Sequence, residues 1–263
     1  MKTKKFPTDN RKAFTLVELL VVIVVIIVLA GMMLPALAAS KSRSAAAGCL
    51  ANLRQLQNAW AIYLDDNNDV MLPNAPLGVS GQGWCPSSTE SWASVAVNTN
   101  VLLYTSILIA PYISSNITVF KCPADVVPSA NGQRLRSYSM NGQMGAASLA
   151  NEYNPGYLAY TYGSDLTCPS PANAFVFVDE HPGSINDGFF QITSASPVFP
   201  DVPASYLEGG CGFSFADGHG EIHQWQTTSL MIPVTYGVTV NEVSVSSMNV
   251  DWQWFSARAT CHQ

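Results

Sequence analysis

The chain has 263 residues, of which 48% are hydrophobic and only 11% are charged, an unusual mix for a soluble domain. Its 27 aromatic residues exclude a disordered chain, because they supply enough apolar surface for a core. Residues 55–263 carry sixteen acidic and four basic side chains, a net charge of −12. So acidic a surface repels phosphate backbones, and we therefore expect no nucleic-acid partner.

A long apolar segment lies near the N-terminus. Residues 19–34 contain no polar side chain, and the charge-free stretch continues to residue 39, which makes 21 residues in all. As a helix, such a stretch is about 31 Å long, enough to cross the hydrocarbon core of a bilayer. Five basic residues precede it. The positive-inside bias therefore predicts a cytoplasmic N-terminus and an exported remainder.

Three interpretations of this N-terminus compete. A simple membrane anchor is one, and a secretory signal peptide is another, because Ala36, Leu37 and Ala38 form a small-residue cleavage site. Glu18 favours the third, an assembly segment. A carboxylate within a membrane segment is costly, and such residues usually have a functional reason.

The residues around Glu18 resemble a known processing signal. Residues 11–20, Arg-Lys-Ala-Phe-Thr-Leu-Val-Glu-Leu-Leu, are similar to the class III signal of type IV prepilins and of the pseudopilins of type II secretion systems. The resemblance implies that a prepilin peptidase cuts between Ala13 and Phe14 on the cytoplasmic side and methylates the new amine. The family usually has Gly where this chain has Ala13. Pro35 lies where many pilins carry a helix-disturbing proline.

Physical arguments support assembly roles for Glu18 and Pro35. Cleavage creates an ammonium on Phe14, and the Glu18 carboxylate of a neighbouring subunit is the oppositely charged partner available in lipid. Pro35 has no backbone N–H, so it lets a helix bend as subunits pack. The resemblance implies that the partners are other copies and other pilin-like subunits, prepilin peptidase and the inner-membrane assembly machinery, with the head in the periplasm or on the cell surface.

The helix is expected to continue beyond the membrane segment. Apolar residues at spacings of three and four form one stripe, made of Leu50, Leu53, Leu56, Trp60, Tyr63 and Leu64. We predict a cytoplasmic leader at residues 1–13, a transmembrane and assembly helix at 14–39, an amphipathic extension at 40–65 and an exported globular head at 66–263. The predicted fold is α+β and pilin-like, with the long helix packed on a mainly antiparallel sheet.

Strand signals gather in the second half of the head. They cover residues 174–178, 189–192, 212–216, 221–225 and part of 234–245. Asp217-Gly218 predicts a tight turn that joins two of these strands into a hairpin. Residues 66–170 are rich in loop signals and receive no assignment.

Three segments of the remaining chain resemble a large bacterial group of prepilin-like proteins. They are residues 49–56, 179–188 and 215–219. That group has a histidine ahead of an Asp-Gly pair, whereas this chain has Leu207 at the matching position. The resemblance therefore reaches both ends of the chain and transfers no role to a histidine here.

Polar side chains of the head are weak candidates for a metal site, because carboxylates and imidazoles bind divalent cations. The candidates are Asp179, His181, Asp187, Asp217, His219 and His223. Turn chemistry and surface hydrogen bonding are the favoured alternative. Residues 65–69 begin like a calcium loop but lack the Gly and Glu of an EF-hand. We interpret them as a polar turn that ends the helix, with calcium as the alternative, and expect no other cofactor.

Six cysteines in an exported head predict at least two disulfides. The cysteines are Cys49, Cys85, Cys122, Cys168, Cys211 and Cys261. We predict that Cys49 ties the helix to the sheet region, and the pairing is otherwise open. Buried free thiols are the alternative for some of the six, and no Cys-x-x-Cys pair indicates a zinc ribbon.

No catalytic motif stands out, because the chain has no nucleophile elbow, zincin helix, phosphate loop or dinucleotide-binding glycine motif. We therefore expect a structural subunit of a type II secretion pseudopilus or a type IV pilus-like filament and no enzyme. The alternatives are a secreted or membrane-anchored binding domain and an anchored metal-dependent enzyme.

Overall fold

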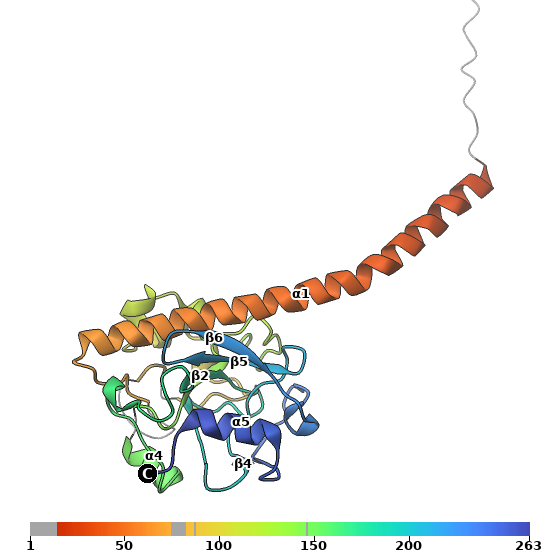
Figure 1. Ribbon diagram of the computed structural model, residues 1–263. Coiled ribbons are helices and arrows are strands. Elements are labelled where there is room, and N and C mark those ends of the chain that lie inside the picture. The colour runs from red at the N-terminus through yellow and green to blue at the C-terminus, as the bar shows by residue number, and fades with distance from the viewer. Residues whose placement is uncertain (1–14, 75–82, 87, 146) are drawn as a thin grey trace, which may run out of the picture. The chain divides into compact units, whose positions relative to one another are not determined.

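The computed structural model describes residues 15–74, 83–86, 88–145 and 147–263 (Figure 1). Residue contacts divide the chain into two units, residues 1–41 and residues 42–263. Helix α1, Leu16–Asp66, belongs to both units. The long helix predicted for residues 14–65 is thus confirmed over its described part.

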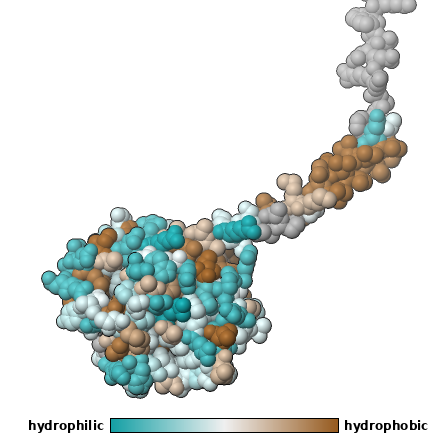
Figure 2. Space-filling view, viewed as in Figure 1, coloured by the Kyte–Doolittle hydropathy of each residue, from teal (hydrophilic) through white to brown (hydrophobic). Residues whose placement is uncertain are grey.

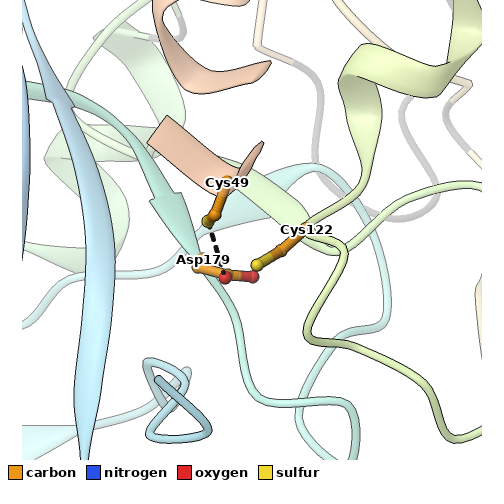
Figure 3. Close-up of side chains that lie close together, drawn as sticks. All are labelled: Cys49, Cys122 and Asp179. Atoms are coloured by element: carbon orange, nitrogen blue, oxygen red, sulfur yellow. Dashed lines mark hydrogen bonds between the residues drawn. The ribbon is translucent and has the colours of Figure 1, made fainter. Parts of the chain in front are cut away.

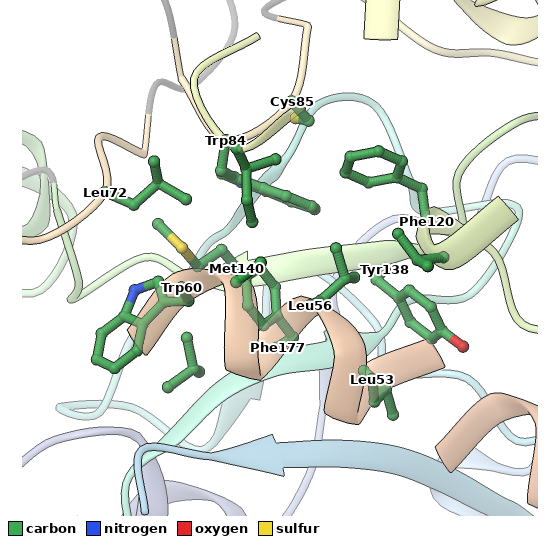
Figure 4. Close-up of a cluster of buried hydrophobic side chains, with 14 of the residues drawn as sticks. Leu53, Leu56, Trp60, Leu72, Trp84, Cys85, Phe120, Tyr138, Met140 and Phe177 are labelled. Carbon is green, nitrogen blue, oxygen red and sulfur yellow. The ribbon is translucent and has the colours of Figure 1, made fainter. Parts of the chain in front are cut away.

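The second half of α1 packs into the core of the head through the stripe that the sequence predicts. Leu53 and Leu56 are fully buried, and Trp60 is 2% exposed. Figure 4 shows these three side chains beside Met140 and Phe177 of the sheet. The exposed residues between them, such as Arg54, keep the opposite face of this half polar.

The central sheet has five strands in the order β3-β1-β2-β5-β6. Their bounds are β1 Tyr138–Asn141, β2 Phe175–Asp179, β3 Phe189–Phe190, β5 Gly210–Phe215 and β6 Gly220–Gln224. Every neighbouring pair is antiparallel except β1 and β3, which are parallel. The predicted α+β fold with a mainly antiparallel sheet is confirmed.

The hairpin predicted at Asp217-Gly218 joins β5 to β6. Gly218 has a φ of 97°, in the left-handed region that glycine adopts without strain. Ser214 pairs with Gly220 and Phe213 with Glu221 across the hairpin. The tight-turn signal therefore sets the register of these two strands.

A second hydrophobic cluster covers the other face of the sheet. It includes Trp252 and Phe255 of α5, Val250–Ala259, packed with Phe175 and Phe213. Asn249 caps this helix by accepting from the backbone N–H groups of Asp251 and Trp252. The sheet thus lies between α1 and α5 in three layers, as Figure 1 shows.

Short elements complete the head. Strands β4, Val198–Phe199, and β7, Val243–Ser244, form a separate antiparallel pair. The remaining helices are α2 Ala96–Thr99, α3 Val101–Thr105, η1 Ala110–Ile113, η2 Ile117–Phe120, α4 Ala147–Tyr153, η3 Gly163–Asp165 and η4 Thr228–Leu230. Most of them fall in the region that the loop signals left unassigned.

The packing of α1 on the sheet generates a stability prediction. Leu56→Ala should lower the free energy of unfolding by about 2–5 kcal/mol, because a fully buried leucine loses its apolar contacts and leaves a cavity. Ile62→Ala is the matched control on the same helix, since Ile62 is 48% exposed and should cost about 0.5 kcal/mol or less. Urea unfolding of the detergent-solubilised chain, followed by tryptophan fluorescence, measures both. Equal losses would contradict this packing.

Candidate functional site

The N-terminal turn of α1 is closed by a reciprocal pair of side chains. The backbone N–H and the hydroxyl of Thr15 donate to Glu18 Oε2 at 2.9 and 2.7 Å. The backbone N–H of Glu18 donates in return to the hydroxyl oxygen of Thr15 at 3.2 Å. This is a capping box, in which a threonine and a glutamate three residues later satisfy the free donors of a helix start. In this structure, therefore, Glu18 has a local role in capping the helix.

The two residues of the predicted cleavage site, Ala13 and Phe14, lie outside the described residues. Pro35 lies within α1, which continues through it. Because proline has no N–H, the carbonyl of Gly31 lacks its usual helical donor at this point. The helix is therefore weakened at Pro35 without being ended there.

The first half of α1 is apolar on all sides. Leu16–Leu34 has a mean hydropathy of 3.1, and no part of it is buried. Leu16 is 78% exposed and Val22 is 46% exposed. Figure 2 shows a continuous hydrophobic surface on the visible face of this segment. Within the described residues it is the one helix long and apolar enough to cross a membrane, a property that signal sequences share.

Comparison with known families adds a finding about this apolar helix. Residues 8–34 match the family described as the prokaryotic N-terminal methylation motif. The match includes Ala13, Phe14 and Glu18 and ends where the exposed apolar segment ends. The chain carries a prepilin-type N-terminus. The comparisons with curated proteins and with solved structures found no match.

The metal candidates taken from the polar motifs of the head do not converge. The antiparallel register pairs Phe175 of β2 with Phe215 and Val178 with Phe213. Asp217 therefore lies beyond the N-terminal end of β2, whereas Asp179 is at its C-terminal end. These weak candidates therefore do not form one cluster, because the length of β2 lies between Asp179 and Asp217.

Most of these side chains serve local turns instead. His181 Nδ1 accepts from the backbone N–H of Gly183 at 3.0 Å, and Asp187 Oδ1 accepts from that of Phe189 at 2.8 Å. At the hairpin tip, His219 Nδ1 lies 2.6 Å from Asp217 Oδ1. His223 is placed elsewhere and stacks on the ring of Trp254.

Residues 65–69 form the polar turn that ends α1. Asn68 and Asp69 have φ values of 55° and 65°, which reverse the chain after the last helical turn. Asp69 Oδ2 accepts from the backbone N–H of Ser164 at 2.9 Å. In the described part of the chain, one group of three or more possible metal ligands has its donor atoms within 4.8 Å, and no member of this turn belongs to it. The carboxylates of this turn are thus not gathered into such a group.

The cysteines differ from the prediction of two or more disulfides. Cys168 and Cys261 are bonded, with 93 positions of sequence between them. The four remaining cysteines are buried free thiols: Cys49, Cys85, Cys122 and Cys211. The predicted Cys49 disulfide is wrong in this structure, because its thiol donates to Asp179 Oδ2 at 3.4 Å. The bond that exists ties the loop before β2 to the segment after α5.

Sequence reasoning missed a set of buried charges beside β1. Arg136 Nη2 lies 3.0 Å from Glu90 Oε2, and both side chains are almost fully buried. Glu180 accepts from the hydroxyls of Ser139 and Ser184. The acidic segment 179–188 could have indicated that Glu180 belongs to a polar site. Nothing in the sequence showed that Arg136 and Glu90 would pair.

A cleft of about 640 Å³ opens beside this set and is lined in part by Glu90, Ser184 and Asp201. Burial raises the pKa of Asp201 to about 7, and repulsion from nearby Asp187 raises it further. The hydrogen bond that the backbone N–H of Gln191 donates to the carboxylate lowers the pKa but does not outweigh burial. Burial and the charge of Asp201 also raise the pKa of Glu180. Both carboxyls therefore hold a proton more tightly in the folded chain than in the unfolded chain.

The acids beside the cleft generate a pH prediction. Between about pH 4 and pH 7 Asp201 binds more proton in the folded chain than in the unfolded chain, so its contribution to the free energy of unfolding should fall as the pH rises through this window. Asp201→Asn should reduce this fall by up to a few kcal/mol, because the amide has the same shape, can still accept from Gln191 and does not ionise. Urea unfolding of both proteins at pH 5 and pH 7.5 measures it. A wild-type chain that gains stability across this window would contradict the assignment.

Proposed function

We propose that this chain is a pilin-like filament subunit, anchored in the inner membrane and processed between Ala13 and Phe14 by a prepilin peptidase. One observation carries the proposal. The methylation motif at residues 8–34 coincides with an exposed apolar helix that starts at Leu16. A segment of this kind needs lipid before assembly and can pack against identical helices afterwards.

The proposed orientation follows from charge. Five basic residues precede the apolar segment, and removal of residues 1–13 takes all five away. The head then lies in the periplasm or on the cell surface, where its disulfide is stable. Its net negative charge and lack of a catalytic motif favour a structural role. The filament is a type II secretion pseudopilus or a type IV pilus-like fibre.

Processing changes the partner of Glu18. In the unprocessed chain, its carboxylate caps the helix through Thr15. Cleavage places a free amine on Phe14, one residue before that cap. In a filament, the Glu18 carboxylate of one subunit and the Phe14 ammonium of the next neutralise each other in an apolar surrounding, where an unpaired charge is costly.

The cleavage position is the first prediction of this function. Protein extracted from membranes of the native host should begin at Phe14, with a methylated amine, and retain the whole apolar helix. Ala13→Gly should be processed normally, whereas Ala13→Leu should accumulate in the uncut form, because a small residue precedes the cut in this family. N-terminal mass spectrometry measures all three proteins. A soluble secreted form that begins at residue 39 would instead establish the signal-peptide interpretation.

The second prediction separates the charge of Glu18 from its capping role. Glutamine also completes a capping box, so Glu18→Gln keeps the local turn and removes only the charge. We expect Glu18→Gln to insert and fold normally but to reduce filament yield by about tenfold or more, the effect of leaving a buried amine unpaired. Thr15→Val is the control, because it removes the capping hydroxyl and keeps the carboxylate. Sheared-filament yield, normalised to membrane-bound subunit, measures both. Normal yield from Glu18→Gln would contradict the charge role.

A further inference from the structure

Three side chains from separate parts of the head bring metal-binding atoms together. Cys49 lies on α1, Cys122 follows η2, and Asp179 ends β2. The two sulfur atoms and a carboxylate oxygen all lie within 4.8 Å of one another. Each residue is completely buried. Figure 3 shows the three side chains pointing toward a common point.

The hydrogen bonds of the group hold its carboxylate in place. Asp179 Oδ2 faces the thiol of Cys49 at 3.4 Å, and the hydroxyl of Tyr206 donates to the other oxygen, Oδ1. The hydroxyl of Tyr138 lies 3.2 Å from the sulfur of Cys49. Neighbours that orient a ligand in this way are typical of metal sites.

The group has no cationic partner. None of the ion pairs within the described residues includes Asp179. Burial raises the pKa of Asp179 to about 7 and that of Cys49 to about 11. Three ionisable groups are thus buried together, and a divalent cation is the species that would allow all three to be charged.

We propose that Cys49, Cys122 and Asp179 bind a zinc ion. Tetrahedral zinc, with bonds of about 2.3 Å to sulfur and about 2.0 Å to oxygen, separates these two ligands by about 3.5 Å. The 3.4 Å between Cys49 Sγ and Asp179 Oδ2 fits that edge. Binding releases the two thiol protons to solvent, together with the proton of Asp179 where that group is protonated, and involves no redox step.

Disulfide formation between Cys49 and Cys122 is the competing outcome, since the head also contains an oxidised pair. A disulfide has no S–H, so Asp179 Oδ2 would lose the donor it has in Cys49. Zinc uses all three side chains and replaces that hydrogen bond with coordination. The presence of the carboxylate therefore favours the metal.

A mostly apolar cleft of about 560 Å³ lies beside Cys122 and is also lined by Asn52, Lys121 and Asp125. Cys122 itself is fully buried, so a bound ion would be enclosed by the head. Once bound, it links α1 to β2 and to the segment after η2, three parts of the head that are far apart in sequence.

Metal content of the full chain tests the proposal. The detergent-solubilised protein, reduced and incubated with zinc, then desalted, should retain about one zinc ion per chain by elemental mass spectrometry. Cys49→Ser and Asp179→Asn should each lower the zinc affinity by about tenfold or more. Cys85→Ser is the matched control, because Cys85 is also a buried free thiol and lies outside the group. It should bind zinc as the wild type does.

Cobalt supplies a readout that needs no variant. Wild-type protein loaded with cobalt should show the near-ultraviolet band of thiolate-to-cobalt charge transfer and the visible bands of tetrahedral cobalt, so a variant that does not fold leaves the test intact. Absence of these bands, or equal zinc retention by the wild type and a folded Cys49→Ser variant, would overturn the proposal. So would a Cys49–Cys122 disulfide in non-reduced peptides of the protein as isolated. None of these results depends on filament formation.

Discussion

The exposed apolar surface of Leu16–Leu34 is the constraint on which the rest of the molecule depends. Nineteen residues without burial carry a mean hydropathy of 3.1, and water cannot accommodate such a helix as a free surface. Lipid or other apolar helices must cover it. The cleavage that we propose between Ala13 and Phe14 leaves this helix on the mature chain, which is consistent with that need. The one carboxylate in the segment, Glu18, is then the only charge there that assembly must neutralise.

In the head, the second half of the same helix is part of the hydrophobic core. Beyond residue 41, α1 buries one side against the sheet through Leu53, Leu56 and Trp60. Helix α5 covers the other face of the sheet. The Cys168–Cys261 bond secures the end of the chain, and the proposed zinc ion would fasten α1 itself. Both devices join segments that are distant in sequence, which suits the proposed function, in which the head must stay folded outside the cytoplasm.

The sequence predicted the elements whose signals are local. The stripe on α1, the strand at 174–178 and the hairpin at Asp217-Gly218 follow from side-chain period and turn chemistry. Strand β1 was missed because all four of its residues are buried and two are polar. Ser139 bonds to Glu180 across the sheet, and Asn141 Nδ2 donates to the carbonyls of Phe175 and Ala259. The hydrogen-bond partners of these buried polar side chains come from distant segments, so no periodic pattern in the sequence could show them.

The candidate site residues also fall into those that a local sequence signal shows and those that only the tertiary fold brings together. Ala13, Phe14 and Glu18 were recognisable because a processing signal is a continuous stretch of residues. The meeting of Cys49, Cys122 and Asp179 depends on three elements that only the tertiary fold brings together. The weak metal candidates Asp179 and Asp217 do not meet for a related reason, since they lie at opposite ends of β2. Of the six candidates taken from the sequence, only Asp179 belongs to the group that we propose to bind zinc.

Electron cryomicroscopy of material sheared from the host cell envelope tests the central claim most directly, with cells that lack the gene as the comparison. We predict filaments whose axis is a bundle of helices that begins at residue 14, with the heads on the outside. Their loss in the deletion strain, or the loss of this subunit from mixed filaments, would agree with the account. A monomeric head in the medium, with unchanged filaments in both strains, would contradict it.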